Sequence, residues 1–102
     1  MTADADTLLR RAIERSADAA AATMRITRSV TTRWASATFA GARHELTLEA
    51  EGSAAAERWL ADLPEAELSL RGQLVADLKL VAITRAAGRI VALLELLTVE
   101  DR

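Results

Sequence analysis

Histidine occurs once in this chain of 102 residues, as His44, and it is the one side chain whose ordinary pKa suits proton transfer near neutral pH. His44 falls on the same strand parity as Leu46 and Leu48, and the spacing places no serine or aspartate beside it. A histidine in that company is more often a hydrogen-bonded residue at the edge of a core than a general base. We therefore expect a structural His44, with a place in the lining of a ligand pocket as the alternative.

Asp77 is the second candidate, because it lies inside an apolar run, where a carboxylate needs a cationic partner. Lys79 follows two residues later and is also the expected partner of Glu95. General acid–base chemistry normally needs a second carboxylate or a histidine within reach. We expect structural ion pairing here. The alternative is a pocket between helix and sheet in which His44 and Asp77 bind a small anionic or apolar ligand, with weak hydrolytic or isomerase chemistry.

Arginines are concentrated in the first half of the chain. Residues 10–43 carry a net charge of +5 and residues 44–102 a net charge of −5, although the whole chain carries only −2. Four of these arginines would form a basic strip on a hairpin, which could hold phosphates or protect a sheet edge, namely Arg25, Arg28, Arg33 and Arg43. No aromatic platform or glycine-rich loop accompanies them. We expect no nucleic-acid partner, with phosphate-backbone binding as an alternative and Arg33 and Arg43 as candidate ligand contacts.

Composition excludes several classes of chemistry. The chain has no cysteine, which excludes disulfides, thiolate nucleophiles and cysteine-based zinc or iron–sulfur sites. Its single histidine excludes a His-Glu-x-x-His zinc helix, and the sequence contains no nucleotide-binding glycine loop, EF-hand or Gly-x-Ser-x-Gly elbow. We therefore expect no catalytic set, no metal and no cofactor.

The sequence has no membrane-spanning pattern. Its longest strongly apolar stretch, Ile90–Val99, has ten residues, includes Glu95 and is about half as long as a membrane helix. The first residues include Asp4 and Asp6 in place of lysines and a leucine run, so we expect no secretory signal and a cytoplasmic location. The 23 alanines, and 12 arginines against one lysine, are typical of a GC-rich bacterial genome.

The elements that would position these residues begin with a helix. Apolar residues recur every three or four positions from Ala5 to about Met24, and Asp4 or Asp6 can cap the start. Beyond Met24 the period changes to two, which predicts a strand with Ile26, Val30 and Trp34 on one parity.

A two-residue turn at Gly41 and Ala42 is predicted to lead from that strand into a second one, Arg43–Glu51. This turn would place Phe39, Ala37 and Ala35 beside His44, Leu46 and Leu48. A three-residue loop, which sets Trp34 beside Leu48, is the alternative register.

A short helix is predicted next, with Ser53 as its N-cap and Pro64 as its stop. Its apolar residues at helical spacing are Ala56, Trp59, Leu60 and Leu63. The stretch Glu65–Arg71 alternates between apolar and polar residues and predicts a third strand. Gly72 then either turns the chain or forms a bulge.

Two long apolar runs, Leu74–Arg85 and Ile90–Val99, fit either a helix or a strand by period alone. Their many β-branched residues favour strands, and Ala86-Ala87-Gly88 is typical of a three-residue hairpin loop. This loop would pair four sets of residues: Arg85 with Arg89, Ile83 with Val91, Val81 with Leu93, and Lys79 with Glu95. The last pair brings opposite charges together across the strands, which supports the register.

These elements predict one α+β domain over residues 1–102, in the order α-β-β-α-β-β-β, with the helices on one face of a mainly antiparallel sheet. Both parities of Ile90–Val99 are apolar, so this strand is either central or part of an interface between subunits. The core is thin, because 23 of the 52 hydrophobic residues are alanines. We expect a small non-enzymatic module that forms a homo-oligomer and acts in binding or assembly; its ligand and partner are unknown.

Overall fold

The computed structural model describes residues 4–101, and it has the expected α+β architecture. The helices and strands follow in the order α1 (Ala5–Ala19), β1 (Met24–Ala35), β2 (Ala40–Glu51), α2 (Ala54–Asp62), a short 3-10 helix η1 (Leu63–Glu65), β3 (Gln73–Ala86) and β4 (Arg89–Glu100). The molecule is elongated, with extents of 46 × 24 × 22 Å.

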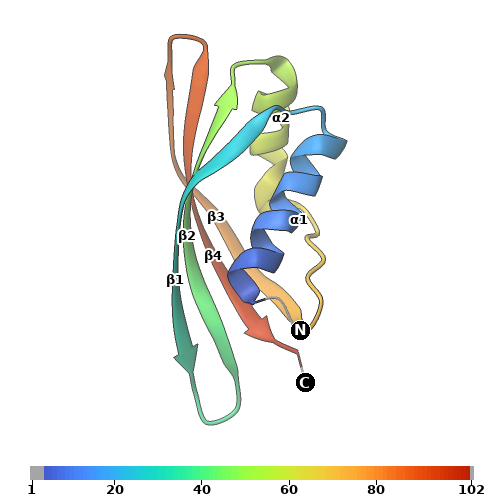
Figure 1. The fold of residues 1–102 in the computed structure, drawn as a ribbon, viewed down its shortest axis with the longest axis vertical. Helices are drawn as coiled ribbons and strands as arrows, with labels where there is room; N and C mark the ends of the chain where they lie inside the picture. Colours follow the sequence, from blue (N-terminus) through green and yellow to red (C-terminus); the bar gives the residue numbers. More distant parts are fainter. Residues whose placement is uncertain (1–3, 102) are drawn as a thin grey trace.

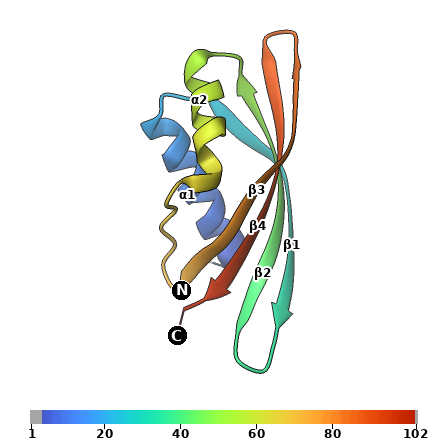
Figure 2. The ribbon, with the colours of Figure 1, turned by 180° about the vertical axis from the view of Figure 1, so that it is seen from behind.

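The four strands form one antiparallel sheet in the order β1-β2-β4-β3. Both helices lie on the same face of this sheet, and the other face carries no helix (Figures 1 and 2). β4 lies between β2 and β3, so of the two positions predicted for the last strand, central in the sheet or at a subunit interface, the structure has the central one. Only β1 and β3 are edge strands.

Both helices begin at the capping residues that their sequences suggest. Asp4 accepts a hydrogen bond from the Thr7 backbone N–H at 2.8 Å, and Ser53 accepts one from the Ala56 N–H at 3.0 Å. α1 is shorter than expected and ends at Ala19, because Ala21 adopts a left-handed conformation (φ 59°) that turns the chain toward the sheet. High alanine propensity therefore does not extend the helix to Met24.

The core fills the space between the helices and the covered face of the sheet. Its largest buried aliphatic side chains come from both layers: Leu9, Ile13, Leu60 and Leu63 from the helical side, and Leu46, Leu48, Ile90, Leu94 and Leu96 from the sheet. The two helices are joined by Trp59, whose indole Nε1 donates to Ser16 Oγ at 3.0 Å. Alanines such as Ala12 and Ala92 allow the two layers to approach closely.

The strand predicted over Glu65–Arg71 is wrong. The chain leaves η1 and runs without a ladder until Gly72, whose φ of 76° makes a turn and not a bulge. Leu68 and Leu70 pack against the core, so the apolar alternation reflects burial without strand pairing. One isolated bridge, between Leu70 and Gln73, closes the turn.

The first hairpin does not turn at Gly41 and Ala42. Its loop is Ser36–Phe39, with Ala35 opposite Ala40, and the Ser36 hydroxyl accepts the Phe39 backbone N–H at 3.0 Å. Both predicted registers are therefore wrong, because Gly41 lies inside β2, opposite Trp34. Gly41 lies where neighbouring groups approach the backbone closely, and the chain does not turn there.

A β-bulge at Thr27 changes which side chains share a face of β1. The register shifts between Ile26 and Arg28, so Ile26 packs on the core whereas Val30 and Trp34 point to the uncovered face. The prediction that Ile26, Val30 and Trp34 share one face is therefore wrong, because a bulge inserts one residue and reverses the parity of all that follow.

The second hairpin has a two-residue turn, Ala87-Gly88, instead of the predicted three-residue loop. Both residues have positive φ, 52° and 74°, as the tight hairpin turn requires. Next to the turn, Ile83 therefore pairs with Ala92 and not with Val91. Because the turn is one residue shorter than predicted, the pairs next to it are shifted by one residue. The bulge at Val81 adds one residue to β3 and cancels this shift, so Lys79 pairs with Glu95 as predicted.

Gly41 gives a test of this packing. A Cβ built there would lie 2.0 Å from the Thr98 carbonyl oxygen and 2.8 Å from Trp34 Cζ2, so Gly41→Ala must displace the backbone between β2 and β4. We expect a loss of about 1–3 kcal/mol in the free energy of unfolding, measured by urea titration. Gly72→Asn is the control, because Gly72 has open space around it and asparagine tolerates its positive φ. Equal midpoints for the two variants would contradict the close approach at Gly41.

Candidate functional site

His44 is fully buried on the covered face of the sheet, at the end nearest the start of α1. Its Nε2 lies 2.9 Å from Thr98 Oγ1, and its Nδ1 lies 3.2 Å from Thr31 Oγ1. Thr98 donates its own hydroxyl proton to the Ala42 carbonyl at 3.3 Å, so Nε2 donates to Thr98 and Nδ1 accepts from Thr31. Both ring nitrogens of a neutral imidazole are thereby satisfied, in the hydrogen-bonded structural role expected for this residue.

The polar chain continues from His44 to the first helix. Ser29 Oγ donates to Asp6 Oδ1, and Thr31 Oγ1, whose proton is directed to His44 Nδ1, lies 3.4 Å from the same carboxylate oxygen. Asp6 is therefore not the N-cap of α1, a role that Asp4 takes. These polar contacts connect α1 with three strands, and they extend from the buried His44 and Thr98 to the exposed Thr31.

Asp77 does not meet His44. His44 and Leu96 lie on the covered face, whereas Asp77 pairs with Leu97, the next residue along β4, and points to the opposite side of the sheet. The pocket that would combine His44 and Asp77 in acid–base chemistry therefore does not form. Asp77 is also exposed rather than buried, and its Oδ2 lies 3.8 Å from Lys79 Nζ in a surface ion pair.

The four arginines of the predicted basic strip do not share one face, because Arg25, Arg28 and Arg43 lie on the uncovered side of the sheet and Arg33 lies on the helical side. Arg33 points to the helical side of the sheet and pairs with Glu100 at 3.5 Å, whereas Arg43 points to the uncovered side. Arg25 pairs with Glu49 at 3.1 Å. The strip required a hairpin register that does not occur, and the acidic partners interrupt what remains of it.

The uncovered side of the sheet, named the open face below, is crossed by rows of side chains, and five of these rows extend over all four strands. Each row takes one residue from each strand in the order β1, β2, β4, β3, because the registers place them opposite one another. The first row is Trp34, Gly41, Val99 and Leu74; the second is Thr32, Arg43, Leu97 and Asp77; the third is Val30, Glu45, Glu95 and Lys79; the fourth is Arg28, Thr47, Leu93 and Ala82, with the bulged Val81 beside it; the fifth is Arg25, Glu49, Val91 and Thr84.

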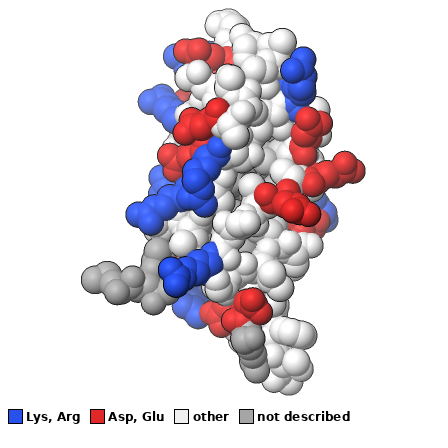
Figure 3. All heavy atoms as spheres, turned by 90° about the vertical axis from the view of Figure 1, so that its right-hand side faces the viewer, with Lys and Arg blue, Asp and Glu red and all other residues white. Residues whose placement is uncertain are grey.

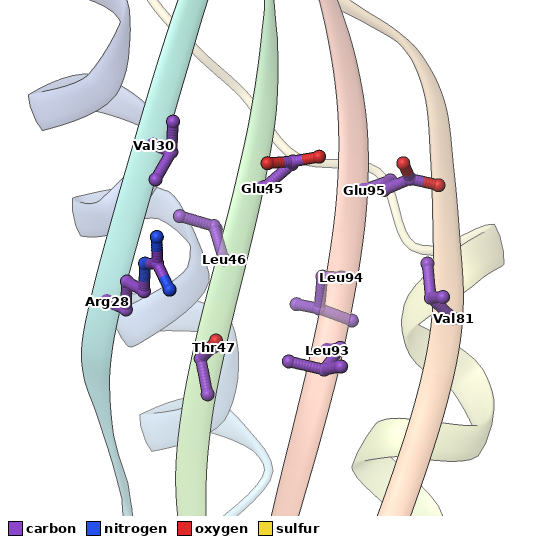
Figure 4. A pocket seen from close by; sticks show the side chains of 9 residues that line it. All are labelled: Arg28, Val30, Glu45, Leu46, Thr47, Val81, Leu93, Leu94 and Glu95. Atoms are coloured by element: carbon purple, nitrogen blue, oxygen red, sulfur yellow. The ribbon is translucent and has the colours of Figure 1, made fainter.

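Apolar side chains are exposed on this face. Among the described residues, five large hydrophobic side chains are more than a third exposed, and all but Phe39 belong to the open face, namely Val30, Leu74, Val81 and Leu93. A shallow groove of about 250 Å³ is lined by Val30, Val81 and Leu93, with Arg28 at one side (Figure 4), and Leu74 lies outside this lining. A second groove of about 590 Å³ lies beside Trp34 and Arg43.

Charges are placed between the apolar positions. Glu45 and Glu95 lie directly opposite each other on the two central strands, one row from Thr47 and Leu93 (Figure 4). Cations lie in the neighbouring positions, Lys79 in the same row and Arg43 in the next. The open face is therefore a mixed surface in which apolar, basic and acidic positions alternate.

The helical side has a different character. Seen from that side, basic side chains gather mostly along one flank and acidic ones along the other, with an uncharged strip between them (Figure 3). A groove between the helices is lined largely by small residues, including Ala19, Ala20 and Ala55. None of the large exposed hydrophobic side chains of residues 4–101 comes from either helix.

The arrangement offers little for metal binding or membrane crossing. Within residues 4–101, no group of three or more His, Asp or Glu side chains could hold a metal ion. In the same part of the chain, neither helix is long and apolar enough to cross a membrane.

Comparison with known proteins adds no assignment. No protein-family model matches the chain, and no curated protein or solved structure matches it either. The function must therefore be argued from the residues and their geometry alone.

Sequence reasoning missed the rows of the open face. It identified Asp77, Lys79, Arg43 and Glu95 one by one, but the rows exist only once the bulges at Thr27 and Val81 have set the parity. The sequence around Val30 and Arg28 does not indicate on which face of the sheet these side chains lie, because the face depends on the residue inserted at the bulge in β1.

The buried histidine makes stability depend on pH. Burial lowers the pKa of His44 below its ordinary value of 6.5, and the Asp6 carboxylate opposes part of that shift. Below about pH 6.5 the unfolded chain binds a proton at His44 that the folded chain does not, so the free energy of unfolding falls as the pH falls. We expect the urea midpoint to drop more between pH 7.5 and 5.5 in the wild-type chain than in His44→Gln. Equal drops in the two proteins would show that burial of His44 is not the cause.

Proposed function

We propose that this chain is a self-associating assembly module whose open face packs against the open face of a second copy. The observation that carries the proposal is the concentration of exposed large hydrophobic side chains on that face, at Val30, Leu74, Val81 and Leu93. Val30, Val81 and Leu93 lie around one groove, and exposed apolar side chains grouped in this way are typical of interaction sites. Two packed sheets would form a sandwich with the helices outside, a common solution for an amphipathic sheet.

The surface area of the chain supports a partner. Its accessible surface is 6536 Å² at a mass of 11.0 kDa, whereas a monomer of that mass exposes about 5,600 Å². The difference of about 900 Å² is close to the roughly 800 Å² that each partner buries in a standard interface. The elongated sheet with one open face accounts for the extra area, and a second copy would cover it.

The sheet edges argue for packing through the face and against pairing through the edges. β1 carries a bulge at Thr27, and β3 carries bulges at Ala76 and Val81. Bulges in edge strands interrupt the ladder and hinder edge-to-edge pairing with another sheet. The open face remains as the surface suited to a second copy.

The proposed role is therefore binding or assembly without catalysis, in a bacterial cytoplasm. The one side chain suited to neutral acid–base chemistry, His44, is buried with both ring nitrogens hydrogen-bonded, which supports a non-enzymatic role. The interleaved Glu45 and Glu95 argue against a phosphate ligand on the open face, because they oppose a second anion there.

Leu93→Glu tests the proposed interface. Leu93 is 42% exposed at the centre of the open face, so the folded monomer tolerates the change, but a partner would bury the new carboxylate among apolar groups. We expect self-association to weaken at least about tenfold, equivalent to about 1.4 kcal/mol, by sedimentation equilibrium. Ala61→Glu is the matched control, because it adds the same charge at an exposed position of α2. A wild-type chain that stays monomeric at high micromolar concentration would refute the proposal.

A further inference from the structure

Covering the open face would bury charges as well as apolar groups. Glu45 and Glu95 face each other across β2 and β4, and like charges in that position repel. A charge that loses water without gaining an opposite charge is strongly destabilising. The partner must therefore keep its own acids away from these two, and a cation over either of them relieves the repulsion. This requirement restricts how a second copy can lie on the face.

The spacing of the rows allows the possible two-fold axes to be compared. Side chains on one face of a strand repeat every two residues, about 6.8 Å, so each row of one sheet can lie over one row of the other. When the axis runs parallel to the strands, each row lies over the same row of the partner subunit, and the order of the strands is reversed. β2 then lies over β4 of the partner subunit, so Glu45 lies over Glu95 of the partner subunit. An axis across the strands at the third row sets Glu45 over Glu45 of the partner subunit. Both arrangements stack carboxylates.

An axis across the strands between the second and third rows removes this conflict. Each strand then lies antiparallel over its own copy, and the second row of one subunit covers the third row of the other. Arg43 lies over Glu45 of the partner subunit, and Asp77 lies over Lys79 of the partner subunit. Because the axis is two-fold, each of these contacts occurs twice.

The same axis brings the first and fourth rows together and leaves the fifth row outside the overlap. The first row covers the fourth, which sets Val99 over Leu93 of the partner subunit and Leu74 over Val81 of the partner subunit. Trp34 then lies over Arg28 of the partner subunit, a pairing in which a guanidinium stacks on an indole. One operation thus brings apolar positions together and sets a cation over Glu45. Glu95 is covered by Leu97 of the partner subunit and keeps Lys79, in its own row, as its neighbouring cation.

From this match we infer that two copies pack through their open faces about a two-fold axis that crosses the strands between the second and third rows, with Arg43 facing Glu45 of the partner subunit. This inference rests on the proposed self-association and adds its symmetry and its charge pairs. Aligned sheets cross at roughly 30°, which displaces the corners more than the middle. The central strand β2 is therefore the place to test it.

A charge exchange within β2 tests the axis. Arg43→Glu and Glu45→Arg each create two like-charge contacts in the dimer, so each variant alone should self-associate at least about tenfold more weakly than the wild-type chain. The double variant R43E/E45R restores opposite charges across the axis, so its dissociation constant should return to within about threefold of wild type. An equimolar mixture of the two single variants should form mixed dimers for the same reason, as measured by sedimentation velocity with one variant fluorescently labelled.

The controls separate the two claims. Arg58→Glu reverses a charge on an exposed site of α2 and should leave self-association unchanged. Circular dichroism and urea unfolding of every variant exclude loss of the fold. If the wild-type chain dimerises but R43E/E45R stays as weak as the single variants, or the single variants dimerise as tightly as wild type, the axis is wrong while the self-association stands. If the wild-type chain is monomeric, the proposed function itself fails.

Discussion

The rest of this structure depends on how much of the sheet its helices can cover. Two helices of 15 and 9 residues pack against strands of 12 to 14 residues, and together they can cover only one face. The covered face holds the core, the caps and the buried histidine. The other face retains its apolar side chains in contact with water, which is unfavourable by roughly 25 cal/mol for each Å². The proposed second copy follows from this imbalance between sheet and helix.

Bulges decide which side chains belong to which face. At Thr27 and Val81 a single inserted residue reverses the parity of a strand, and it does so on the two edge strands. The reversal at Thr27 sends Val30 and Trp34 outward, and the one at Val81 keeps Lys79 opposite Glu95. The same distortions discourage edge pairing, so one feature both shapes the open face and directs association toward it.

The polar side chains divide between the two faces by function. On the covered side, His44 is held between Thr31 and Thr98 and serves the packing of the layers. On the open side, acids and bases alternate with apolar residues along β2 and β4, as in the rim and core of an interface. His44 and Asp77 are candidates for acid–base chemistry by residue type, but they lie on opposite faces of the sheet.

Local signals in the sequence determined much of this protein. The N-caps at Asp4 and Ser53, the long strands after Gly72 and the central place of the last strand follow from neighbouring residues and were predicted. The separation of His44 from Asp77, the loop at Ser36–Phe39 and the rows of the open face were decided by the tertiary structure. The physical reason is that a face is a property of the whole strand: one bulge or one loop residue, stabilised by contacts with distant segments such as Thr98 against Gly41, reassigns every side chain beyond it.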